Sequence, residues 1–442
     1  MLTKIYGVSI LEIGAEYMVE TKTIVFFPRK MFSALLGQAN DKKISLILGA
    51  RQTGKTTLLK QLHLGLSKTN KCLFLDLDVL SNYEKVSTFE KLLNTLKVDG
   101  YVENQKDFFF LFLDEFQKYS SMTKIMKNVY DNLGNVKIYA SGSSSVTIKD
   151  QIQESLAGRK RVTELFPLDF EEFLWFKQKD KLAKNISNIS KLKGDSLYSS
   201  LKEYYALLEE FLIFGGYPEV ALKSTKEEKM EVLSSIFDLY VKKDLVEYLN
   251  MEKILETKKL IEFLAVNNGQ KIKYDNLSAI TSLKFNEIKR QIEILRETYI
   301  IEILRPFYTN KNKEIVKIPK MYFIDNGVRN FFINNFNELT LRNDSGFLFE
   351  EFVISELLKK GTRNLKFWQD KNGNEVDIII EGANLIPIEV KFKQNLKSED
   401  FRGIKAFLKE YSKVKKSYLV NLAVQKTLKK TKFILPYCLN LQ

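Results

Sequence analysis

The chain has 442 residues, a hydrophobic fraction of 45% and a formal net charge of +14, and a chain of this length is expected to form about three domains. Its two cysteines and single histidine argue against a disulfide framework, a histidine metal cluster and a Ser-His-Asp triad, and no apolar run reaches the ~18 residues of a membrane span. Because the N-terminal residues lack a secretory signal, we expect a cytoplasmic protein without a membrane partner. The positive charge fits a polyanion partner and a merely lysine-rich surface equally well.

A phosphate-binding loop is the first motif along the chain, after an N-terminal extension at 1–28 and a short helix expected at 29–36. An apolar strand leads into Gly49–Thr56, whose sequence GARQTGKT matches the consensus G-x-x-x-x-G-K-[ST]. In such loops backbone N–H groups bind phosphate, Lys55 would reach the β- and γ-phosphates, and Thr56 would ligate Mg²⁺. The predicted nucleotide-binding residues are Gly49, Arg51, Gln52, Thr53, Gly54, Lys55, Thr56 and Thr57. The motif predicts ATP and Mg²⁺ as cofactors.

Two further buried strands are expected at 71–78 and 108–115, with a helix at 83–96 between them. The second strand, FFFLFLDE, ends in Asp114 and Glu115, and ligands bind at the carboxyl ends of strands in open α/β sheets. We predict that Asp114 supports the Mg²⁺ ion and that Glu115 polarises the attacking water. An ordinary acidic strand exit is the alternative.

A fourth strand, expected at 136–140, is followed by the sequence SGSSS. Ser141 and Ser143 are both candidates to contact the γ-phosphate or to orient the water, and a plain Ser/Gly turn is the alternative. Before the next strand, expected at 162–166, we favour Arg159 over Arg161 as an arginine finger that reaches the γ-phosphate bound by an adjacent subunit. This hypothesis implies a homo-oligomer, and an arginine that meets no phosphate is the alternative.

The middle of the chain is expected to form a helical lid at 176–250 and a winged helix-turn-helix at 251–330. The lid helices are expected at 204–214 and 229–249, where apolar residues recur at helical spacing. The winged segment is expected to contain helices at 254–266, 274–281 and 285–297 and strands at 300–306 and 314–318. In its third helix, Lys289 and Arg290 are candidates to bind DNA phosphates or base edges. A segment that only packs between domains is the alternative.

The C-terminal part contains a second set of candidate catalytic residues. Its strands are expected at 375–380 and 386–391. Neighbouring strands would place Asp377 beside Glu389 and Lys391 on one face of a sheet, where two carboxylates bind a divalent cation and the lysine orients a water. This order of residues is the D…E-x-K pattern of restriction-endonuclease-like folds. By this pattern, Glu350 of this chain would be a further metal ligand, placed on the helix before the two strands. A nuclease-like fold without cleavage is the alternative.

The sequence resembles the AAA-type ATPases of bacteria and archaea that carry a C-terminal domain of unknown function. The resemblance is carried by GARQTGKTT, LFLDEFQK, ASGSSS and SLAGRKRVTELFPLDFEEFL, and by residues 214–219 (FGGYPE), 240–244 (YVKKD), 319–327 (PKMYFIDNG) and 346–391. It covers nearly everything after the N-terminal extension. It implies an AAA+ core, a winged-helix-like segment and a C-terminal domain of the PD-(D/E)xK restriction-endonuclease-like class.

We therefore predict an α/β protein with a P-loop AAA+-type parallel-sheet core at 29–175, the helical lid, the winged helix-turn-helix and a nuclease-like α/β domain at 331–442. The predicted function is a Mg²⁺-dependent ATPase that binds DNA, with cleavage by the C-terminal domain left open. The alternative is a nucleotide-controlled switch or scaffold whose C-terminal domain binds a partner without cleavage. A small-molecule kinase shares the loop but is disfavoured by Asp114, Glu115 and the long remainder of the chain.

Overall fold

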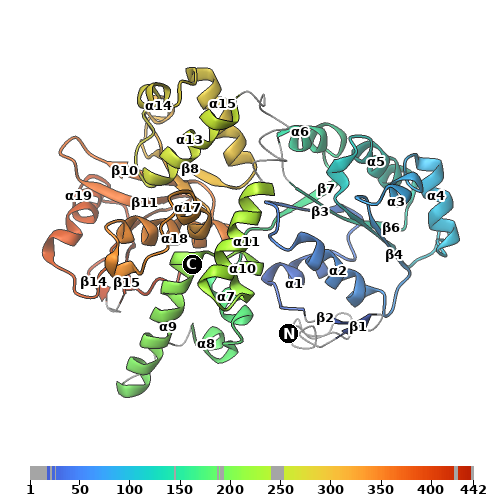
Figure 1. Ribbon diagram of the computed structural model, residues 1–442, viewed down its shortest axis with the longest axis horizontal. Coiled ribbons are helices and arrows are strands. Elements are labelled where there is room, and N and C mark those ends of the chain that lie inside the picture. The colour runs from blue at the N-terminus through green and yellow to red at the C-terminus, as the bar shows by residue number, and fades with distance from the viewer. Residues whose placement is uncertain are drawn as a thin grey trace. The chain divides into compact units, whose positions relative to one another are not determined.

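The computed structural model describes residues 17–19, 22–24, 26–143, 146–186, 189, 194–239, 253–422 and 427–439. The chain divides into two compact units, Met1–Phe166 and Pro167–Gln442, and each has its own sheet (Figure 1). A small antiparallel hairpin of β1 (Tyr17–Val19) and β2 (Lys22–Ile24) belongs to the first unit. None of the helices in the described part of the chain combines the length and the apolar character that a membrane span requires.

The first unit is built on a five-stranded sheet in the order β4-β5-β6-β3-β7, and all neighbouring strands run parallel. The strands are β3 (Ile44–Gly49), β4 (Cys72–Asp76), β5 (Phe109–Asp114), β6 (Val136–Ser143) and β7 (Lys160–Glu164). Strands β3, β5 and β6 are buried along their whole length because both faces of the sheet are covered. The predicted parallel sheet is confirmed, although β6 extends to Ser143 and β7 begins earlier than expected.

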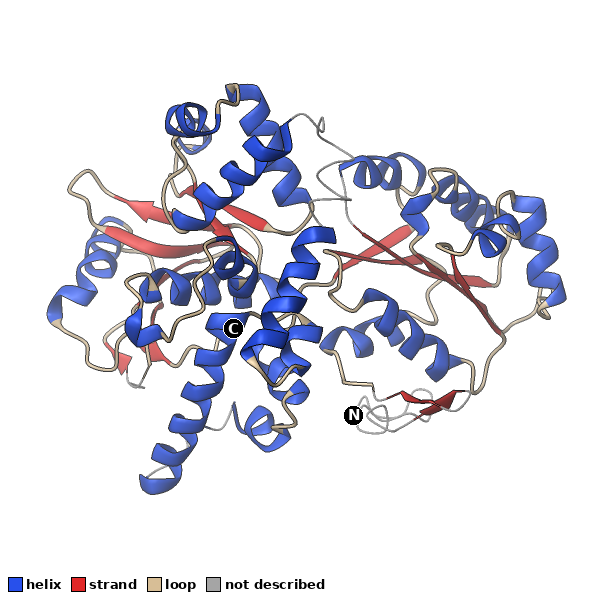
Figure 2. Cartoon of the chain, viewed as in Figure 1, coloured by secondary structure: helices blue, strands red, loops and turns tan. Residues whose placement is uncertain are grey.

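Helices cover both faces of this sheet (Figure 2). On one face, α1 and α2 pack through Leu35 and Leu59 against Phe112, and on the other face α4, α5 and α6 contribute buried residues such as Leu92 and Met126. The helices are α1 (Lys30–Leu36), α2 (Lys55–Leu66), α3 (Leu80–Glu84), α4 (Phe89–Val98), α5 (Met122–Asn132) and α6 (Val146–Ser155).

The helix predicted at 83–96 is wrong in one respect, because the structure divides it into α3 and α4. Thr88 interrupts it as an N-cap whose side chain accepts a hydrogen bond from the Lys91 backbone N–H at 3.3 Å. An N-cap satisfies backbone donors that a new helix leaves open, so the chain begins α4 there.

The second unit contains a mixed sheet in the order β14-β15-β13-β12-β11-β10-β8-β9. Its strands are β8 (Ile301–Pro306), β9 (Lys320–Phe323), β10 (Leu365–Gln369), β11 (Glu375–Glu381), β12 (Leu385–Val390), β13 (Ser417–Val420), β14 (Thr427–Leu428) and β15 (Thr431–Ile434). Strands β10, β11 and β12 pair antiparallel, whereas β13 runs parallel to β12. Helix α19 (Arg402–Glu410) packs on this sheet through Ile404 and Phe407.

Most of the remaining chain in the second unit is helical. The helices are α7 (Phe170–Phe176), α8 (Asp180–Asn185), α9 (Gly194–Phe214), α10 (Pro218–Leu222), α11 (Lys226–Leu239), α13 (Ile254–Val266), α14 (Tyr274–Thr281), α15 (Phe285–Glu297), α16 (Lys311–Val316), α17 (Asn326–Phe332) and α18 (Ser345–Lys359). The helices predicted from 254 to 297 are confirmed with the expected bounds. Part of the helix predicted at 229–249 is α11, and its end lies outside the described residues.

The second strand predicted for the winged segment, at 314–318, is wrong because α16 occupies most of that stretch. The Asn310 side chain accepts from the Asn312 backbone N–H at 3.0 Å and caps the helix, and Glu314 is drawn inward by the ammonium of Lys366 at 2.5 Å. The actual partner of β8 is β9. Strand β8 also pairs with β10, so this hairpin is part of the C-terminal sheet and does not stand free as a wing.

Candidate functional site

The phosphate loop between β3 and α2 needs glycine at both glycine positions of its consensus, Gly49 and Gly54. Gly54 precedes α2 with φ of 92°, a conformation that side chains disfavour. A Cβ on Gly49 would lie 2.2 Å from the carbonyl oxygen of Leu165. Gly49 therefore makes room for the chain that leaves β7, whereas Gly54 turns the loop into the helix.

Two buried cations contact the loop, Lys55 from its end and Arg29 from the residue before α1. The Lys55 side chain is 4% exposed, and its ammonium donates to the carbonyl oxygen of Ala50 at 2.7 Å. Arg29 braces the loop by donating to the carbonyl oxygens of Thr53 at 2.7 Å and Phe166 at 2.9 Å. This role of Arg29 could not be predicted from a motif, because both of its partners are backbone atoms.

Asp114 lies at the end of β5, buried to 1% exposure and beside the phosphate loop. It accepts hydrogen bonds from the hydroxyls of Ser141 and Thr56. Burial raises the pKa of this carboxyl; the two hydroxyls oppose the shift, and the carboxylates of Glu115 and Asp76 add to it. A hydroxyl and a carboxylate in contact are the hard oxygen ligands that Mg²⁺ prefers, with phosphates and waters completing its shell. The residues present therefore fit a Mg²⁺–nucleotide.

Glu115 and Ser143 flank this pair. Glu115 has a left-handed backbone with φ of 54° at the start of the 3₁₀ turn η1 (Phe116–Lys118), and its carboxylate accepts a hydrogen bond from the Gln117 amide. Ser143 is aligned with Gly49 in the register of β6 and β3, and its buried hydroxyl has no hydrogen-bond partner among the described residues. The Ser141 hydroxyl is thus engaged by Asp114, whereas a contact of Ser143 with a bound nucleotide stays a prediction.

Arg159 lies at the amino-terminal ends of the strands, whereas the phosphate loop follows the carboxyl end of the neighbouring strand β3. It immediately precedes β7, whose first residue pairs with the first residue of β3. Its guanidinium binds Asp131 through Nε at 2.7 Å and Nη2 at 3.2 Å. This position excludes a contact with the phosphate loop of its own sheet and leaves the neighbouring-subunit hypothesis as a proposal.

The second unit brings together the acids and the lysine that were predicted at its C-terminal end. Asp377 and Glu389 lie opposite each other by the register of β11 and β12. The Lys391 ammonium lies 2.6 Å from Glu389 Oε1 and 3.8 Å from Asp377 Oδ2. Glu350 lies on α18, close enough for its carboxyl to interact electrostatically with the carboxylates of Asp377 and Glu389. Glu389 Oε2 is buried without a hydrogen-bond partner among the described residues.

The acids of this cluster are held in an environment that disfavours their charge. Burial, followed by the Asp377 carboxylate, raises the pKa of Glu350 to about 7. Burial and the same neighbour raise the pKa of Glu389 well above its usual range, and burial also raises that of Asp377. Burial lowers the pKa of Lys391, but the carboxylates of Asp377, Glu389 and Glu350 together raise it above its usual value. Asp377, Glu389 and Glu350 are therefore carboxylates that repel one another beside a firmly protonated Lys391.

Three residues that no D…E-x-K pattern contains complete the cluster. Tyr322 on β9 is fully buried and donates its hydroxyl to Glu350, and Lys320 on the same strand pairs with Glu375 and lies 3.8 Å from Glu350. Alternation along a strand places Lys320 and Tyr322 on one face, but the sequence alone could not reveal that β9 lies in this sheet. Within the described residues, no three carboxylate, histidine or cysteine side chains are arranged to hold a metal ion.

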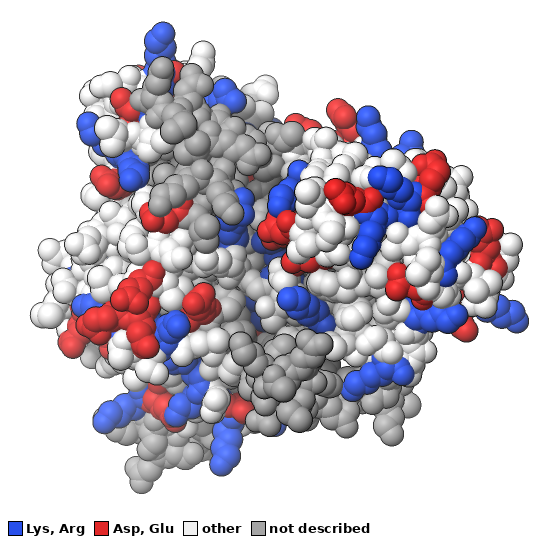
Figure 3. Space-filling view, turned by 45° about the vertical axis from the view of Figure 1, so that its right-hand side comes forward, with Lys and Arg blue, Asp and Glu red and all other residues white. Residues whose placement is uncertain are grey.

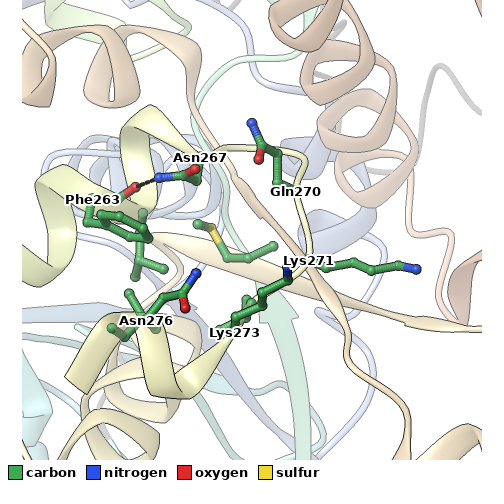
Figure 4. A pocket seen from close by; sticks show the side chains of 10 residues that line it. Phe263, Asn267, Gln270, Lys271, Lys273 and Asn276 are labelled. Carbon is green, nitrogen blue, oxygen red and sulfur yellow. Dashed lines mark hydrogen bonds between the residues drawn. The ribbon is translucent and has the colours of Figure 1, made fainter. Parts of the chain in front are cut away.

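The predicted DNA-contacting residues Lys289 and Arg290 are exposed on α15. Among the described residues on the face shown in Figure 3, basic side chains are interspersed with acidic ones and form no single patch. A pocket of about 130 Å³ lies between α13, α14 and β9. Asn267, whose amide donates to the Phe263 carbonyl oxygen at 2.9 Å, and Asn276 line it beside apolar side chains (Figure 4). The pocket shares no lining residue with either candidate site.

Comparison with known proteins defines the class to which this geometry belongs. An AAA domain matches residues 41–174, and two domains of unknown function match residues 205–339 and 345–439. The phosphate loop, the parallel sheet and this match together define an AAA-type P-loop ATPase.

An uncharacterized protein of Methanocaldococcus jannaschii is 31% identical over 385 residues, which cover 84% of this chain and 80% of the relative. The chain belongs to the same family as this archaeal protein. An uncharacterized protein of Haemophilus influenzae is 27% identical over 334 residues, which cover 72% of this chain and 75% of that relative.

Solved structures with similarity to the chain include a Walker-type ATPase of Pyrococcus abyssi and the RuvB Holliday junction branch migration motor of Thermotoga maritima. The first is 17% identical with a TM-score of 0.45, covering 70% of this chain and 96% of that chain. The second is 14% identical with a TM-score of 0.32, covering 66% of this chain and 95% of that chain.

Proposed function

We propose that the chain is a Mg²⁺-dependent ATPase whose hydrolysis is coupled to DNA binding by its second unit. The observation that carries the first part is the buried Lys55 in the glycine loop next to Asp114 bonded to Thr56. Lys55 binds the β- and γ-phosphates, Thr56 and Asp114 hold Mg²⁺, and Glu115 accepts the proton of the attacking water. The bound Mg²⁺ supplies charge neutralisation at the phosphates.

Two variants separate nucleotide binding from hydrolysis. Glu115→Gln should keep ATP affinity and lose most turnover, because it removes the base and leaves the phosphate loop intact. Lys55→Ala should lose affinity as well, because it removes the cation that faces the phosphates. ATP affinity is measured with a fluorescent nucleotide and turnover by phosphate release. Wild-type turnover in Glu115→Gln would refute the assignment of the base.

DNA binding is supported by the net charge of +14 and by the exposure of Lys289 and Arg290 on α15. The double variant Lys289→Ala/Arg290→Ala should bind duplex DNA more weakly and with a shallower salt dependence, because fewer counterions are released. Replacing the exposed Lys409 and Lys413 by alanine removes the same charge elsewhere and is the control. Equal affinity and equal salt slope in the α15 variant and wild type would move the contact away from α15.

A second activity, Mg²⁺-dependent cleavage of phosphodiesters, is favoured at the C-terminal cluster by one observation. Four carboxylates, those of Glu350, Glu375, Asp377 and Glu389, share the cluster with only two ammonium groups, and Glu389 Oε2 has no partner within the described residues. A divalent cation held by Asp377 and Glu389 would balance the excess negative charge.

Metal binding and cleavage are tested on the same variants. Mn²⁺ should raise the melting temperature of the wild type, since a ligand that binds only the folded state stabilises it, and Asp377→Asn should abolish that increase while ATP hydrolysis persists. Any DNA cleavage should vanish in Asp377→Asn and Lys391→Ala alike. Stabilisation by Mn²⁺ without cleavage would favour the alternative, a C-terminal domain that binds a partner. Equal stabilisation of Asp377→Asn would remove the proposed cation site.

A further inference from the structure

The turn that follows β5 contains a side chain that no motif assigns to the ATPase site. Gln117 lies two positions after Glu115, in η1, and its amide nitrogen donates to Glu115 Oε2. No hydrogen bond from the described residues ends on Glu115 Oε1. The amide therefore engages one carboxylate oxygen and leaves the other open to accept a proton.

Gln117 packs closely against the neighbouring strand, where its amide oxygen is buried without a hydrogen-bond partner among the described residues. A Cβ on Gly142 of β6 would lie 2.5 Å from Gln117 Oε1 and 2.9 Å from the ring of Phe116. Phe116 is fully buried in the core of the sheet, so it anchors the turn from one side. The space that a side chain at position 142 would fill is thus occupied by the turn, and Gly142 is the residue that permits the amide to reach Glu115.

The backbone of Glu115 is strained, and its carboxylate has no hydrogen-bond donor among the described residues except Gln117. A non-glycine residue in the left-handed region costs about 1–2 kcal/mol, and Glu115 has φ of 54°. A carboxylate on a strained turn with no other hydrogen bond would sample several rotamers. A donor held by Gly142 and Phe116 selects one of them.

We propose that Gln117 is a positioning residue for hydrolysis, which holds the Glu115 carboxylate in the orientation that accepts the proton of the attacking water. The proposal rests on the function proposed for Glu115. Gln117 acts through Glu115, so it contributes to turnover and not to nucleotide binding.

The first test compares turnover with affinity. Gln117→Ala should lower kcat by roughly tenfold or more, because small displacements of a catalytic group are costly, while the ATP dissociation constant and the melting temperature remain close to those of the wild type. Gly142→Ala should have the same effect through displacement of the amide. Gln105→Ala and Gly134→Ala, which remove an exposed amide and fill open space, are the matched controls.

The second test is a double-mutant cycle with Glu115→Gln. If Gln117 acts through Glu115, then Gln117→Ala should cost nothing further in the Glu115→Gln background. The proposal is overturned by a wild-type kcat in Gln117→Ala, by a parallel loss of ATP affinity, or by the same fold-loss in both backgrounds. A wild type without ATP hydrolysis, or an active Glu115→Gln, would instead overturn the function proposed for the site.

Discussion

Gly49 and Gly65 show how differently the structure uses two glycines of the same strand–loop–helix unit. A Cβ on Gly49 would lie 2.2 Å from the backbone oxygen of Leu165, whereas the nearest atom to a Cβ on Gly65 is the Phe32 ring at 3.9 Å. A backbone atom cannot move aside as a flexible side chain can, so the first position tolerates no side chain. The second is a helical position where glycine only adds conformational freedom to the unfolded chain.

Alanine at the two positions should therefore have opposite effects. Gly65→Ala should raise the free energy of unfolding by about 0.5 kcal/mol, while Gly49→Ala should lower it and weaken ATP binding, because β7 or the phosphate loop must shift. Urea unfolding and nucleotide titration measure both. A Gly49→Ala variant with wild-type stability and affinity would show that the loop does not need the contact with Leu165.

Lys137 is a buried ammonium at the other end of the sheet. Burial lowers its pKa to about 7, from 10.5 in an unfolded chain, although Asp41 opposes the shift. It is 0% exposed and donates to the hydroxyl of Ser45 at 2.8 Å and to the carbonyl oxygen of Lys43. Between pH 7 and 10.5 the unfolded chain thus binds this proton more often than the folded chain does. The free energy of unfolding therefore increases as the pH rises through this range.

Comparison with Lys137→Met isolates this group. The free energy of unfolding of the wild type should rise relative to the variant by up to about 1.4 kcal/mol per pH unit between pH 7 and 10. Below pH 7 both forms of the chain bind the proton and the difference should level off. Urea unfolding at several pH values supplies the measurement. Parallel pH profiles for the two proteins would mean that Lys137 keeps its ordinary pKa.

At the scale of elements, α16 is where sequence and structure differ most clearly. Ile315, Val316 and Ile318 suggest a strand, yet the first two lie exposed on the helix. Tertiary contacts decide the outcome: Glu314 is buried between Lys366 of β10 at 2.5 Å and Lys311 at 3.2 Å. Periodicity over a few residues could not reveal ion pairs to residues that are distant in sequence.

The ion pair between Glu314 and Lys366 should therefore stabilise α16. Glu314→Ala should lower the free energy of unfolding by about 1–3 kcal/mol, less than the ~3–5 expected for a wholly unpaired buried charge, because Lys366 also pairs with Glu381. The exposed Glu262→Ala on α13 is the control for loss of a helical glutamate. Equal stability of the two variants would show that α16 is held by other contacts.

At the scale of the whole molecule, the sequence predicted the first unit better than the second. Strands such as FFFLFLDE are buried on both faces and the phosphate loop has an unambiguous consensus, so the parallel sheet and the positions of Lys55 and Asp114 followed from local patterns. The C-terminal sheet depends on long-range pairing, in which β8 and β9 join β10 across residue 330. For that reason Asp377, Glu389 and Lys391 were predicted together, whereas Lys320 and Tyr322 were not.

The position of Arg159 in the first unit bears on whether the protein must form an oligomer to hydrolyse ATP. Its guanidinium binds Asp131, and Arg159 lies at the amino-terminal ends of the strands, away from the phosphate loop at the carboxyl end of β3, so any contact with a γ-phosphate must be made in a neighbouring subunit. Arg159→Ala should then lower turnover by roughly tenfold or more without lowering ATP affinity, as loss of an arginine finger does. Arg161→Ala, which removes the nearby arginine paired with Asp41, should leave turnover unchanged.

Mixing the two impaired variants Arg159→Ala and Lys55→Ala tests the contact between subunits directly. Arg159→Ala retains an intact phosphate loop, and Lys55→Ala retains an intact arginine, so a mixed interface contains one complete site. The mixture should hydrolyse ATP faster than the sum of the separate samples, and the gain should fall on dilution as the oligomer dissociates. Phosphate release and sedimentation at the same concentrations give the rate and the assembly state. Full turnover by a strictly monomeric wild type, or a mixture no faster than the sum, would exclude an arginine that acts between subunits.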